Sequence, residues 1–424
     1  MREGTRCFLI PPSDLQDRRK RCRPEVQKLL RFKWETITSC NVCSSRRSAI
    51  ISTADRYGLP EQTALCLDCG LFYLTQRFAA EAYSRFYSNG SFRNISSRFN
   101  KVTHTIERIR AEQVDYARTL SSVLGAFVSS GCKTKLLDVG GSVGLVTSEF
   151  VNRFGMSGTV LDPAEEEVAA ARGRGLDAVV GTIEKYDTDE RYDLILLCRS
   201  VEHLTDLREG FARMRNLLKP GGLLYCDIAD FMELCCQVGP PQTITKIDHC
   251  YWLTRSTALD IFRALGFELV SMNIVFGFGY AGYLLRSCEP QMMGSVPEER
   301  IQTLIERIHQ TEFEWSTDTS RTIWQSLRFK AYRMKRMGLR LTATNGDGRR
   351  VNRQPAVGER LSVPTSVPAA LPITDLNPVV RSEPSADSIA SAAPDQLVEK
   401  IRASVVATPQ SSLAPTTIHL KNSC

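Results

Sequence analysis

Short apolar runs alternate with amphipathic segments through the middle of the chain. The runs typical of strands are 135–139, 158–162, 177–180, 192–198 and 223–228. Helical spacing of apolar residues predicts helices at 144–154, 164–173 and 207–218, the last ending at the Lys-Pro-Gly-Gly turn of 219–222. Such alternation predicts an α/β domain, in which helices cover both faces of a parallel sheet.

The pattern changes after residue 254. A helix is predicted over 255–265, followed by strands over 267–275 and 283–286 with the glycine-rich turn 277–282 between them. A connection this short allows an antiparallel hairpin but not a parallel crossover. The expected sheet is therefore parallel along most of its width and ends in an antiparallel hairpin.

The two ends of the chain have other patterns. Helical spacing recurs in the charged N-terminal region and at 78–90, 101–127 and 295–338, whereas nine of the 19 prolines fall in 351–424 among Ser, Ala and Thr. That last composition is typical of disorder. The predicted parts are an N-terminal extension (1–35), a metal-binding module (36–80), a helical connector (81–130), the α/β domain (131–290), C-terminal helices (291–338) and a disordered tail (339–424).

Composition and charge narrow the classes of partner. The chain has 424 residues and a formal net charge of +7, with 54 Lys and Arg against 47 Asp and Glu. This excess is small for a nucleic-acid-binding protein, so nucleic acid is not the expected partner. No apolar run approaches the roughly 20 residues that span a bilayer, and the N-terminus lacks an apolar signal segment. A cytoplasmic protein without a membrane span is expected, and its oligomeric state is open.

Four of the 14 cysteines form a specific pattern. Cys40 and Cys43 make one C-x-x-C pair, and Cys66 and Cys69 make a second. Two such pairs can present four thiolates to one tetrahedral zinc ion, as in a zinc ribbon. Four protein ligands leave no open position, so the zinc is expected to be structural. The alternative is a reduced fold that binds no metal, because cytoplasmic cysteines often pack as small hydrophobic residues.

A glycine-rich turn follows the first predicted strand of the α/β domain. Residues 136–144 read Leu-Leu-Asp-Val-Gly-Gly-Ser-Val-Gly, and a second acid, Asp162, ends the next strand. Both acids are expected at the carboxyl edge of the sheet, where nucleosides bind. The turn lacks the G-x-G-x-x-G fingerprint of dinucleotide sites and the lysine of a P-loop. A ligand without phosphates, S-adenosyl-L-methionine, fits this turn better, and the alternative is a tight turn with no ligand.

Several motifs match one family in order along the chain. The segments LLDVGGSVG, VLDP, YDLILLCRSVEHLTD and LLKPGGLLYCDIAD resemble the successive motifs of class I S-adenosylmethionine-dependent methyltransferases, over about 130–290. The cysteine quartet, followed by Gly-Leu-Phe-Tyr (70–73) and the Phe-Tyr pair 86–87, is similar to the N-terminal module of bacterial sugar C-methyltransferases. The resemblance implies a Rossmann-like seven-stranded sheet, zinc, and S-adenosyl-L-methionine as the cofactor.

The resemblance also assigns residues to the cofactor. It implies that Asp138, Gly140, Ser142 and Gly144 hold the methionine part and that Asp162 holds the ribose. It implies that Thr182, Ile183 and Glu184 line the adenine, and it places Cys198 beside the cofactor at the end of the fourth-strand motif. The chain departs from the family pattern at Ser142, where glycine is typical, at Thr182, where an acid is typical, and at Arg199, where histidine is common.

The segment Asp248-His249-Cys250-Tyr251 resembles the Glu-His-x-x-Tyr-Phe-like segment of the same enzymes. By this resemblance His249 is the candidate base, because an imidazole with a pKa of about 6.5 accepts protons at neutral pH. Tyr251 is the candidate donor to an enolate. The alternative for His249 is a hydrogen-bonded loop histidine. For His203, a place at the start of a helix or beside the site is the favoured interpretation.

Three functions remain open from the sequence. The first is methylation of a small molecule at carbon or oxygen, with a nucleotide-linked or glycan sugar as the substrate. The second is methylation of RNA or protein, with the zinc module as the reader. The third is a non-catalytic scaffold that keeps the methyltransferase fold.

Overall fold

The computed structural model describes residues 10–273 and 279–317. The predicted disordered tail (339–424) lies outside the described residues, as do the end of the predicted strand 267–275, the start of the turn 277–282 and the later part of the predicted C-terminal helices. No helix in the two described ranges is long and apolar enough to cross a membrane.

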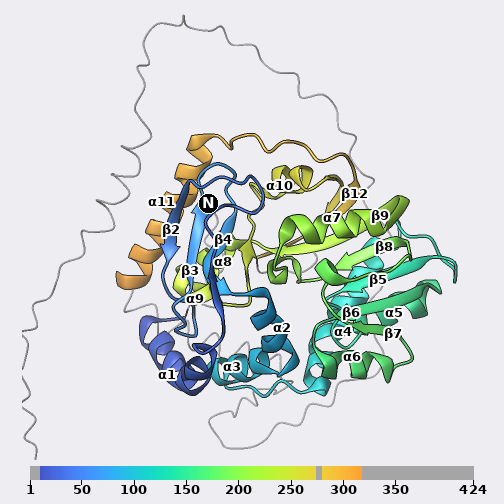
Figure 1. Cartoon of the computed structure of the whole chain (residues 1–424), viewed down its shortest axis with the longest axis horizontal. Coiled ribbons are helices and arrows are strands. Elements are labelled where there is room, and N and C mark those ends of the chain that lie inside the picture. The colour runs from blue at the N-terminus through green and yellow to red at the C-terminus, as the bar shows by residue number, and fades with distance from the viewer. Residues whose placement is uncertain (1–9, 274–278, 318–424) are drawn as a thin grey trace, which may run out of the picture. The chain divides into compact units, whose positions relative to one another are not determined.

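A mixed seven-stranded sheet forms the centre of the α/β domain (Figure 1). Its strands follow one another in space in the order β11 (Phe267–Asn273), β12 (Tyr280–Ser287), β9 (Leu218–Ala229), β8 (Tyr192–Leu197), β5 (Lys135–Val139), β6 (Ser157–Asp162) and β7 (Asp177–Val180). The strands from β9 to β7 pair in parallel, and β12 pairs antiparallel with both β9 and β11. The predicted parallel sheet with a terminal hairpin is confirmed.

The sheet is buried on both faces because neighbouring residues of a strand point to opposite sides. In β5, Leu137 joins the core cluster that also contains Ile195 and Leu224, whereas Leu136 joins the cluster that contains Leu194 and Tyr225. The second cluster packs under two helices, α4 (Ile106–Leu124) and α5 (Leu145–Phe154). Continuous apolar strands in the sequence therefore correspond to strands covered on two sides. The remaining helices of the domain are α6 (Glu165–Arg172), α7 (Leu207–Leu217), α8 (Phe231–Val238), α9 (Pro241–Ile244) and α10 (Ala258–Ala264).

The strand order reverses at β5, which lies between β6 and β8. The chain leaves β5 toward β6 on one side and returns to β8 on the other. Open α/β sheets bind their ligands in the crevice that this reversal creates at the carboxyl ends of the strands. The ends of β5, β6 and β8 therefore define where a site is to be sought.

One predicted turn is part of a strand. The Lys-Pro-Gly-Gly segment 219–222 belongs to β9, which begins at Leu218. Tyr192 pairs with Leu218 and Leu194 with Leu223, so the register shifts across this segment. Gly221 has a φ of +78°, as a local turn would require. The glycines thus form an irregularity within the pairing, which the sequence pattern does not distinguish from a free turn.

A second, antiparallel sheet belongs to the N-terminal module. Its strands lie in the order β1 (Trp34–Thr36), β4 (Phe72–Phe78), β3 (Gln62–Cys66) and β2 (Ser48–Ser52). The short strand β10 (Tyr251–Trp252), which comes much later in the sequence, pairs antiparallel with β4. Tyr251 lies opposite Tyr73, and Trp252 lies opposite Phe72. The segment after the fifth strand of the α/β domain therefore completes the sheet of the N-terminal module.

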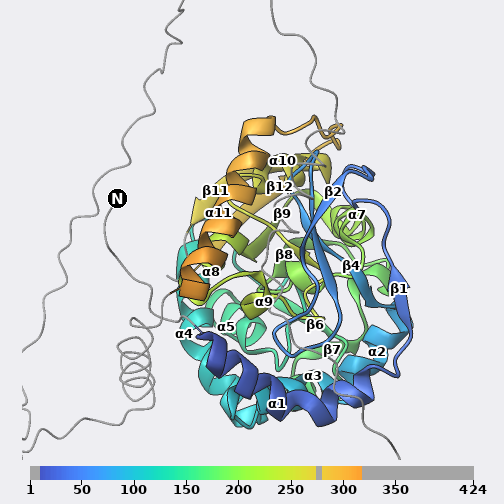
Figure 2. The ribbon, with the colours of Figure 1, turned by 90° about the vertical axis from the view of Figure 1, so that its left-hand side faces the viewer.

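Helices lie around this second sheet (Figures 1 and 2). They are α1 (Pro12–Leu29), α2 (Ala80–Ser88), α3 (Ser91–Asn100) and the C-terminal α11 (Glu298–Thr317). The sequence pattern missed α3, which begins after Gly90, a residue with a φ of +71°. Helix α11 packs against α8, and the indole N–H of Trp315 donates to the carbonyl of Ile10 at 2.6 Å. The two ends of the described chain thus meet beside the N-terminal module.

One carboxyl group is fully buried where β3 begins. Glu61 has 0% of its surface exposed, and the Thr63 hydroxyl lies 3.1 Å from both of its carboxylate oxygens. Burial raises the pKa of Glu61 to about 8, and the nearby Asp55 raises it further. The folded protein therefore keeps a proton on Glu61 that the unfolded chain has already released at neutral pH.

This proton predicts how stability depends on pH. The stabilisation is complete below the ordinary glutamate pKa of 4.5 and is lost as pH rises toward the folded-state pKa of about 8. We expect the unfolding free energy of the wild type to fall relative to Glu61→Gln by about 1 kcal/mol per pH unit in this window. Urea unfolding at pH 5.5, 6.5 and 7.5 measures it, with the exposed Glu298→Gln as the control. If the unfolding free energy depended on pH equally in the wild type and in Glu61→Gln, the raised pKa assigned to Glu61 would be contradicted.

Candidate functional site

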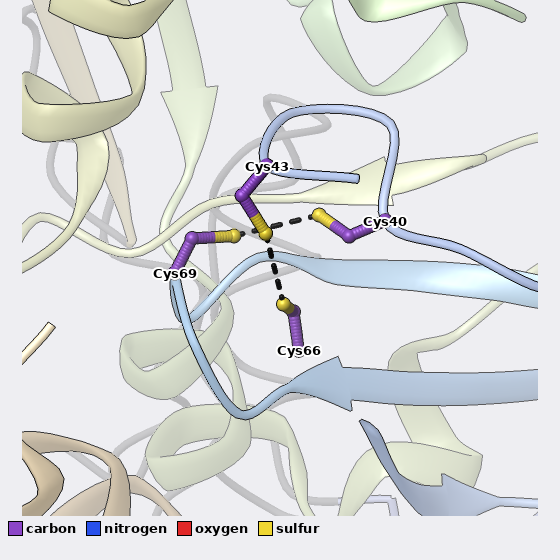
Figure 3. Close-up of side chains that lie close together, drawn as sticks. All are labelled: Cys40, Cys43, Cys66 and Cys69. Atoms are coloured by element: carbon purple, nitrogen blue, oxygen red, sulfur yellow. Dashed lines mark hydrogen bonds between the residues drawn. The ribbon is translucent and has the colours of Figure 1, made fainter. Parts of the chain in front are cut away.

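The four predicted metal ligands converge from two turns of the N-terminal module (Figure 3). Cys40 and Cys43 lie on the loop before β2, Cys66 is the last residue of β3, and Cys69 lies on the turn between β3 and β4. The Cys40 and Cys69 sulfurs are 3.4 Å apart, the Cys43 and Cys66 sulfurs are 3.5 Å apart, and all four lie within 4.8 Å of one another. The structure brings all four together.

The chemistry and size of this cluster fit a tetrahedral metal. Thiolates around one zinc ion at about 2.3 Å lie about 3.8 Å from each other, close to the spacing observed here. Cys40, Cys66 and Cys69 are buried, and Cys43 is partly exposed. Gly70, after the second pair, has the positive φ that the turn requires, +75°. The four sulfurs therefore have the arrangement of a closed structural site.

The glycine-rich turn leads from β5 into α5 at the strand-order reversal. Gly140, Ser142 and Gly144 all have positive φ angles, of +71°, +52° and +71°. Ser142 therefore adopts a conformation that favours glycine, at a cost of about 1 kcal/mol. Its backbone N–H donates to the carboxylate of Asp162 at 2.9 Å, which fixes the turn against the end of β6. The departure from glycine at Ser142 thus lies where backbone strain is concentrated.

The two acids at the ends of β5 and β6 are buried. Burial raises the pKa of Asp138 to about 6 and that of Asp162 to about 7, the latter with a further contribution from Glu167. One Asp138 oxygen accepts from the Thr147 hydroxyl at 2.7 Å, whereas the other oxygen, Oδ1, is buried without a hydrogen-bond partner among the described residues. Such an acceptor fits a ligand that carries a cationic donor, as the methionine ammonium does.

A cavity of about 470 Å³ opens above these acids. Its lining includes seven of the eight residues predicted to bind the cofactor, namely Asp138, Gly140, Ser142, Asp162, Thr182, Ile183 and Cys198. Gly144 is not in the lining: a Cβ there would approach Leu176 to 2.5 Å, so this glycine is required for packing. Glu184 does line the cavity, but its carboxylate accepts from the Thr205 backbone N–H at 2.9 Å and is already engaged.

The lining of the same cavity also includes titratable groups that can accept or donate protons. Tyr87 from α2, His203 from the short 3₁₀ helix η2 (Val201–His203), Lys246 and Asp248 all line the cavity. The Tyr87 hydroxyl lies 3.1 Å from His203 Nδ1, and Asp248 Oδ2 lies 3.1 Å from Lys246 Nζ and 3.8 Å from His203 Nδ1. Sequence reasoning singled out His203 but gave it a lesser role, and it missed Lys246, which has no motif of its own.

The two predicted catalytic residues lie outside this lining. His249 is 6% exposed and is not in the cavity lining; its ring centroid is 4.5 Å from that of His203 at an angle of 86°. The Tyr251 hydroxyl donates to the carbonyl of Thr205 at 3.0 Å and lies 3.4 Å from the Arg77 guanidinium. Tyr251 also lies outside the lining, because the pairing of β10 with β4 directs it into the N-terminal module. Its hydroxyl contacts protein groups in this structure, and the contact with an enolate stays a prediction.

Both histidines are neutral at pH 7. Burial, followed by the charge of Lys246, lowers the pKa of His203 to about 4 and holds that of His249 well below its usual value. Burial raises the pKa of Glu202, the neighbour of His203, to about 7. Glu202, His203 and His249 also offer ligand atoms within 4.8 Å of one another. The charge of Lys246 in the same corner disfavours a further positive charge there, whereas the Asp248 carboxylate, 3.8 Å from His203 Nδ1, favours one on His203.

Comparison with known proteins identifies the domain. Residues 95–272 match the family described as a methyltransferase domain. A ubiquinone biosynthesis O-methyltransferase of Bradyrhizobium sp. (strain ORS 278) is 35% identical over 96 residues, and one of Paramagnetospirillum magneticum is 37% identical over 94 residues. Each match covers 21% of this chain, and the chain spans 38% and 37% of the lengths of these two relatives.

Solved structures to which the chain is similar at low identity include two named as methyltransferases. A glycopeptide N-methyltransferase complexed with S-adenosyl-L-methionine is 17% identical, with a TM-score of 0.33, and the match covers 41% of this chain and 93% of that one. A mitomycin 7-O-methyltransferase is 18% identical, with a TM-score of 0.35, and covers 49% and 60%. The family match and the sequence relatives support a methyltransferase domain within residues 95–272, and the mixed seven-stranded sheet agrees with that assignment.

Proposed function

We propose that this methyltransferase domain transfers the methyl group of S-adenosyl-L-methionine to a carbon or oxygen atom of a small molecule, namely a nucleotide-linked or glycan sugar. One observation carries the proposal: a single cavity joins the glycine-rich turn and both strand-end acids to Tyr87, His203, Lys246 and Asp248. A methyl donor and an acceptor held in that cavity would be adjacent, and alignment alone contributes several kcal/mol to such a displacement.

The first wall supplies the groups that would hold the cofactor. The unpartnered Asp138 oxygen would accept from the methionine ammonium, and Asp162 would accept from the ribose hydroxyls while it keeps its bond to the Ser142 N–H. Gly140 has a positive φ, and a Cβ at this position would lie 2.5 Å from the Ser200 hydroxyl. The turn therefore requires glycine at this point, where the backbone would approach the cofactor. Thr182 and Ile183 would line the adenine. The cofactor supplies an electrophilic methyl group; the chain supplies alignment.

The second wall supplies the proton acceptor. The sequence places this role on His249, but of these two histidines it is His203 that lines the cavity, with His249 packed edge to face behind it. We therefore place His203 next to the acceptor and His249 as the ring that supports it. Removal of a proton from a hydroxyl, or from the carbon beside a ketone, gives the nucleophile that attacks the methyl group. Tyr87, bonded to His203 Nδ1, fixes the orientation of the imidazole.

The choice of substrate has separate support. The N-terminal module, with its cysteine quartet, is the part of the chain that resembles sugar C-methyltransferases, and β10 links that module directly to the 246–249 wall of the cavity. The sequence relatives, in contrast, are named as O-methyltransferases. Carbon and oxygen acceptors are therefore both to be tested, with keto sugar nucleotides as the first panel and hydroxyl-bearing acceptors as the second.

We also propose that the cysteine quartet binds one structural zinc ion. The spacing of the four sulfurs and their burial support it. Zinc would hold together the 40–43 loop and the 66–69 turn. Since β4 follows the second turn and pairs with β10, the metal would stabilise the sheet that carries one wall of the cavity.

The proposed cofactor site predicts a binding phenotype. Calorimetry should detect S-adenosylhomocysteine binding to the wild type, and Asp162→Asn should weaken it by about tenfold or more, because a charge-assisted hydrogen bond is lost and the glycine-rich turn loosens. The exposed Asp177→Asn at the start of β7 serves as the matched control and should bind normally. Absence of binding to folded wild-type protein would refute the proposed activity.

The proposed base predicts a difference between two histidines. His203→Gln should lower turnover by about 100-fold, the usual contribution of a general base, while S-adenosylhomocysteine affinity stays within about twofold. His249→Gln should lower turnover by less than about tenfold, because the imidazole beside the acceptor remains. The exposed His309→Gln controls for the substitution itself. A larger loss in His249→Gln than in His203→Gln would return the role of base to His249.

The metal proposal predicts a stoichiometry. Protein purified without chelator should contain about one zinc ion per chain by elemental analysis. Cys66→Ser should lose that zinc and lower the melting temperature, whereas Cys132→Ser, at an exposed cysteine outside the quartet, should change neither. Less than half an equivalent of zinc in the wild type would count against the site.

A further inference from the structure

One side chain of the cysteine quartet's first loop points away from the metal ligands and toward the α/β domain. Asn41 lies between Cys40 and Cys43 and cannot be a zinc ligand in a four-cysteine site. Its amide Nδ2 donates to Asp206 Oδ1 at 3.1 Å, and its Oδ1 accepts from the backbone N–H of Arg208 at 3.1 Å. The nitrogen and the oxygen of the Asn41 amide thus bond to two residues that lie 165 and 167 positions later in the sequence.

These contacts are made at the N-terminus of helix α7. Asp206 is its N-cap, and the same oxygen, Oδ1, also accepts from the backbone N–H of Glu209 at 3.0 Å. Since the first N–H groups of a helix have no partners within it, Asn41 acts as a second cap that another part of the chain supplies. The Arg208 guanidinium returns the contact, because its Nε donates to the carbonyl of Val42 at 3.1 Å.

The capped end of α7 is also the end of the segment that carries His203. Only Leu204 and Thr205 separate that histidine from Asp206. The Thr205 backbone is held from two further sides, by Glu184 at its N–H (2.9 Å) and by Tyr251 at its carbonyl (3.0 Å). The hydrogen bonds of Asn41 are therefore among the contacts that fix the position of residues 200–206 in the cavity wall.

We propose that Asn41 is a positioning residue that couples the four-cysteine site to the reacting histidine segment. The inference rests on the proposed methyl transfer for its effect on turnover. The coupling runs from the cysteine loop through Asn41 to Asp206 and Arg208, and from there to His203. Because Asn41 lies outside the cavity lining, any effect of its substitution on turnover must pass through this segment.

The geometry explains why the coupling depends on the metal. Asn41 occupies the middle of a four-residue loop whose two ends are both ligands. With the thiolates drawn to one ion, the loop has one conformation and aims the amide at α7. Without the ion, the loop keeps backbone bonds such as Ser44 N–H to the Cys40 carbonyl (2.9 Å) and its contacts with α7, but its two ends are no longer fixed by shared thiolate ligation, and we expect the Asn41 amide to leave the helix end more often.

A pair of substitutions that exchanges the Asn and Asp side chains between positions 41 and 206 tests the coupling. Asn41→Asp removes the Nδ2 donor and places a second carboxylate against Asp206, where two like charges repel. Adding Asp206→Asn to the same chain restores a donor–acceptor pair and keeps a good N-cap, since Asn and Asp cap helices about equally well. The four chains form a double-mutant cycle. Asn89→Asp, at an exposed asparagine whose Oδ1 accepts from the Ser91 N–H, controls for the added charge.

Hydrogen exchange gives the direct readout. We expect the amides of 203–209 to exchange about fivefold faster in Asn41→Asp, in line with the loss of a helix cap, and to recover in the double variant, with Asn89→Asp unchanged. Zinc content should stay at the wild-type level in all chains. Removing zinc from the wild type with a chelator should accelerate exchange in the same 203–209 segment.

Kinetics gives the second readout. Turnover should fall by about tenfold or more in Asn41→Asp with little change in KM or in S-adenosylhomocysteine affinity, and should recover in the double variant, because a small displacement of a reacting group mainly affects the chemical step. Unchanged exchange in Asn41→Asp, no rescue by Asp206→Asn, or full protection of 203–209 after zinc removal would each overturn the coupling. Failure of the methyltransferase proposal instead appears as no turnover in any chain, with the exchange results intact.

Discussion

The pairing of β10 with β4 is the contact on which the arrangement of the site depends. It joins two residues that follow the fifth strand of the α/β domain to the central strand of the N-terminal sheet. The residues just before β10, from Lys246 to His249, are thereby held between the two sheets, and Lys246 and Asp248 reach the cavity. His203, Lys246 and Asp248 of the second wall come from the α/β domain itself, and Tyr87 is added by α2, the helix that follows the N-terminal sheet.

Burial governs the electrostatics of the cavity. Asp138, Asp162 and Glu202 have raised pKa values because each carboxylate has left water, whereas the two histidines have lowered ones for the same reason. Lys246 acts on the histidines in the same direction as burial. The site therefore holds neutral imidazoles, and the Asp248 carboxylate acts on His203 in the opposite direction by favouring its protonated form.

Two series of contacts connect the cysteine quartet to the cavity-lining residues that are proposed to react. The first cysteine loop contacts the start of α7 through Asn41, and the turn after the second pair leads into β4, which pairs with β10. Both routes end on segments that line the cavity, one at His203 and the other at Lys246 and Asp248. A structural metal in the N-terminal module is thus placed to support both parts of the second wall, without touching the substrate itself.

Local sequence patterns determined the elements of the α/β domain and its cofactor side. Apolar runs of strand length, amphipathic helices between them and a glycine turn that ends in α5 are short-range features, so β5 to β9 and residues such as Asp138 and Asp162 could be predicted from the residues themselves. The quartet could be predicted for the same reason, because each C-x-x-C pair is a local turn.

Only the tertiary structure decided which groups face the acceptor. His203 and His249 are separated by 45 intervening residues and were ranked in the reverse order of their access to the cavity. Which of the two histidines reaches the cavity depends on the pairing of the two-residue strand β10 with β4, nearly 180 residues earlier in the sequence. No local pattern encodes that contact. Lys246 and Asn41 carry no motif at all, because their roles come from what the fold places opposite them. The sequence thus determined the elements and the candidate ligands for the proposed cofactor and metal, whereas long-range pairing determined the second wall of the cavity.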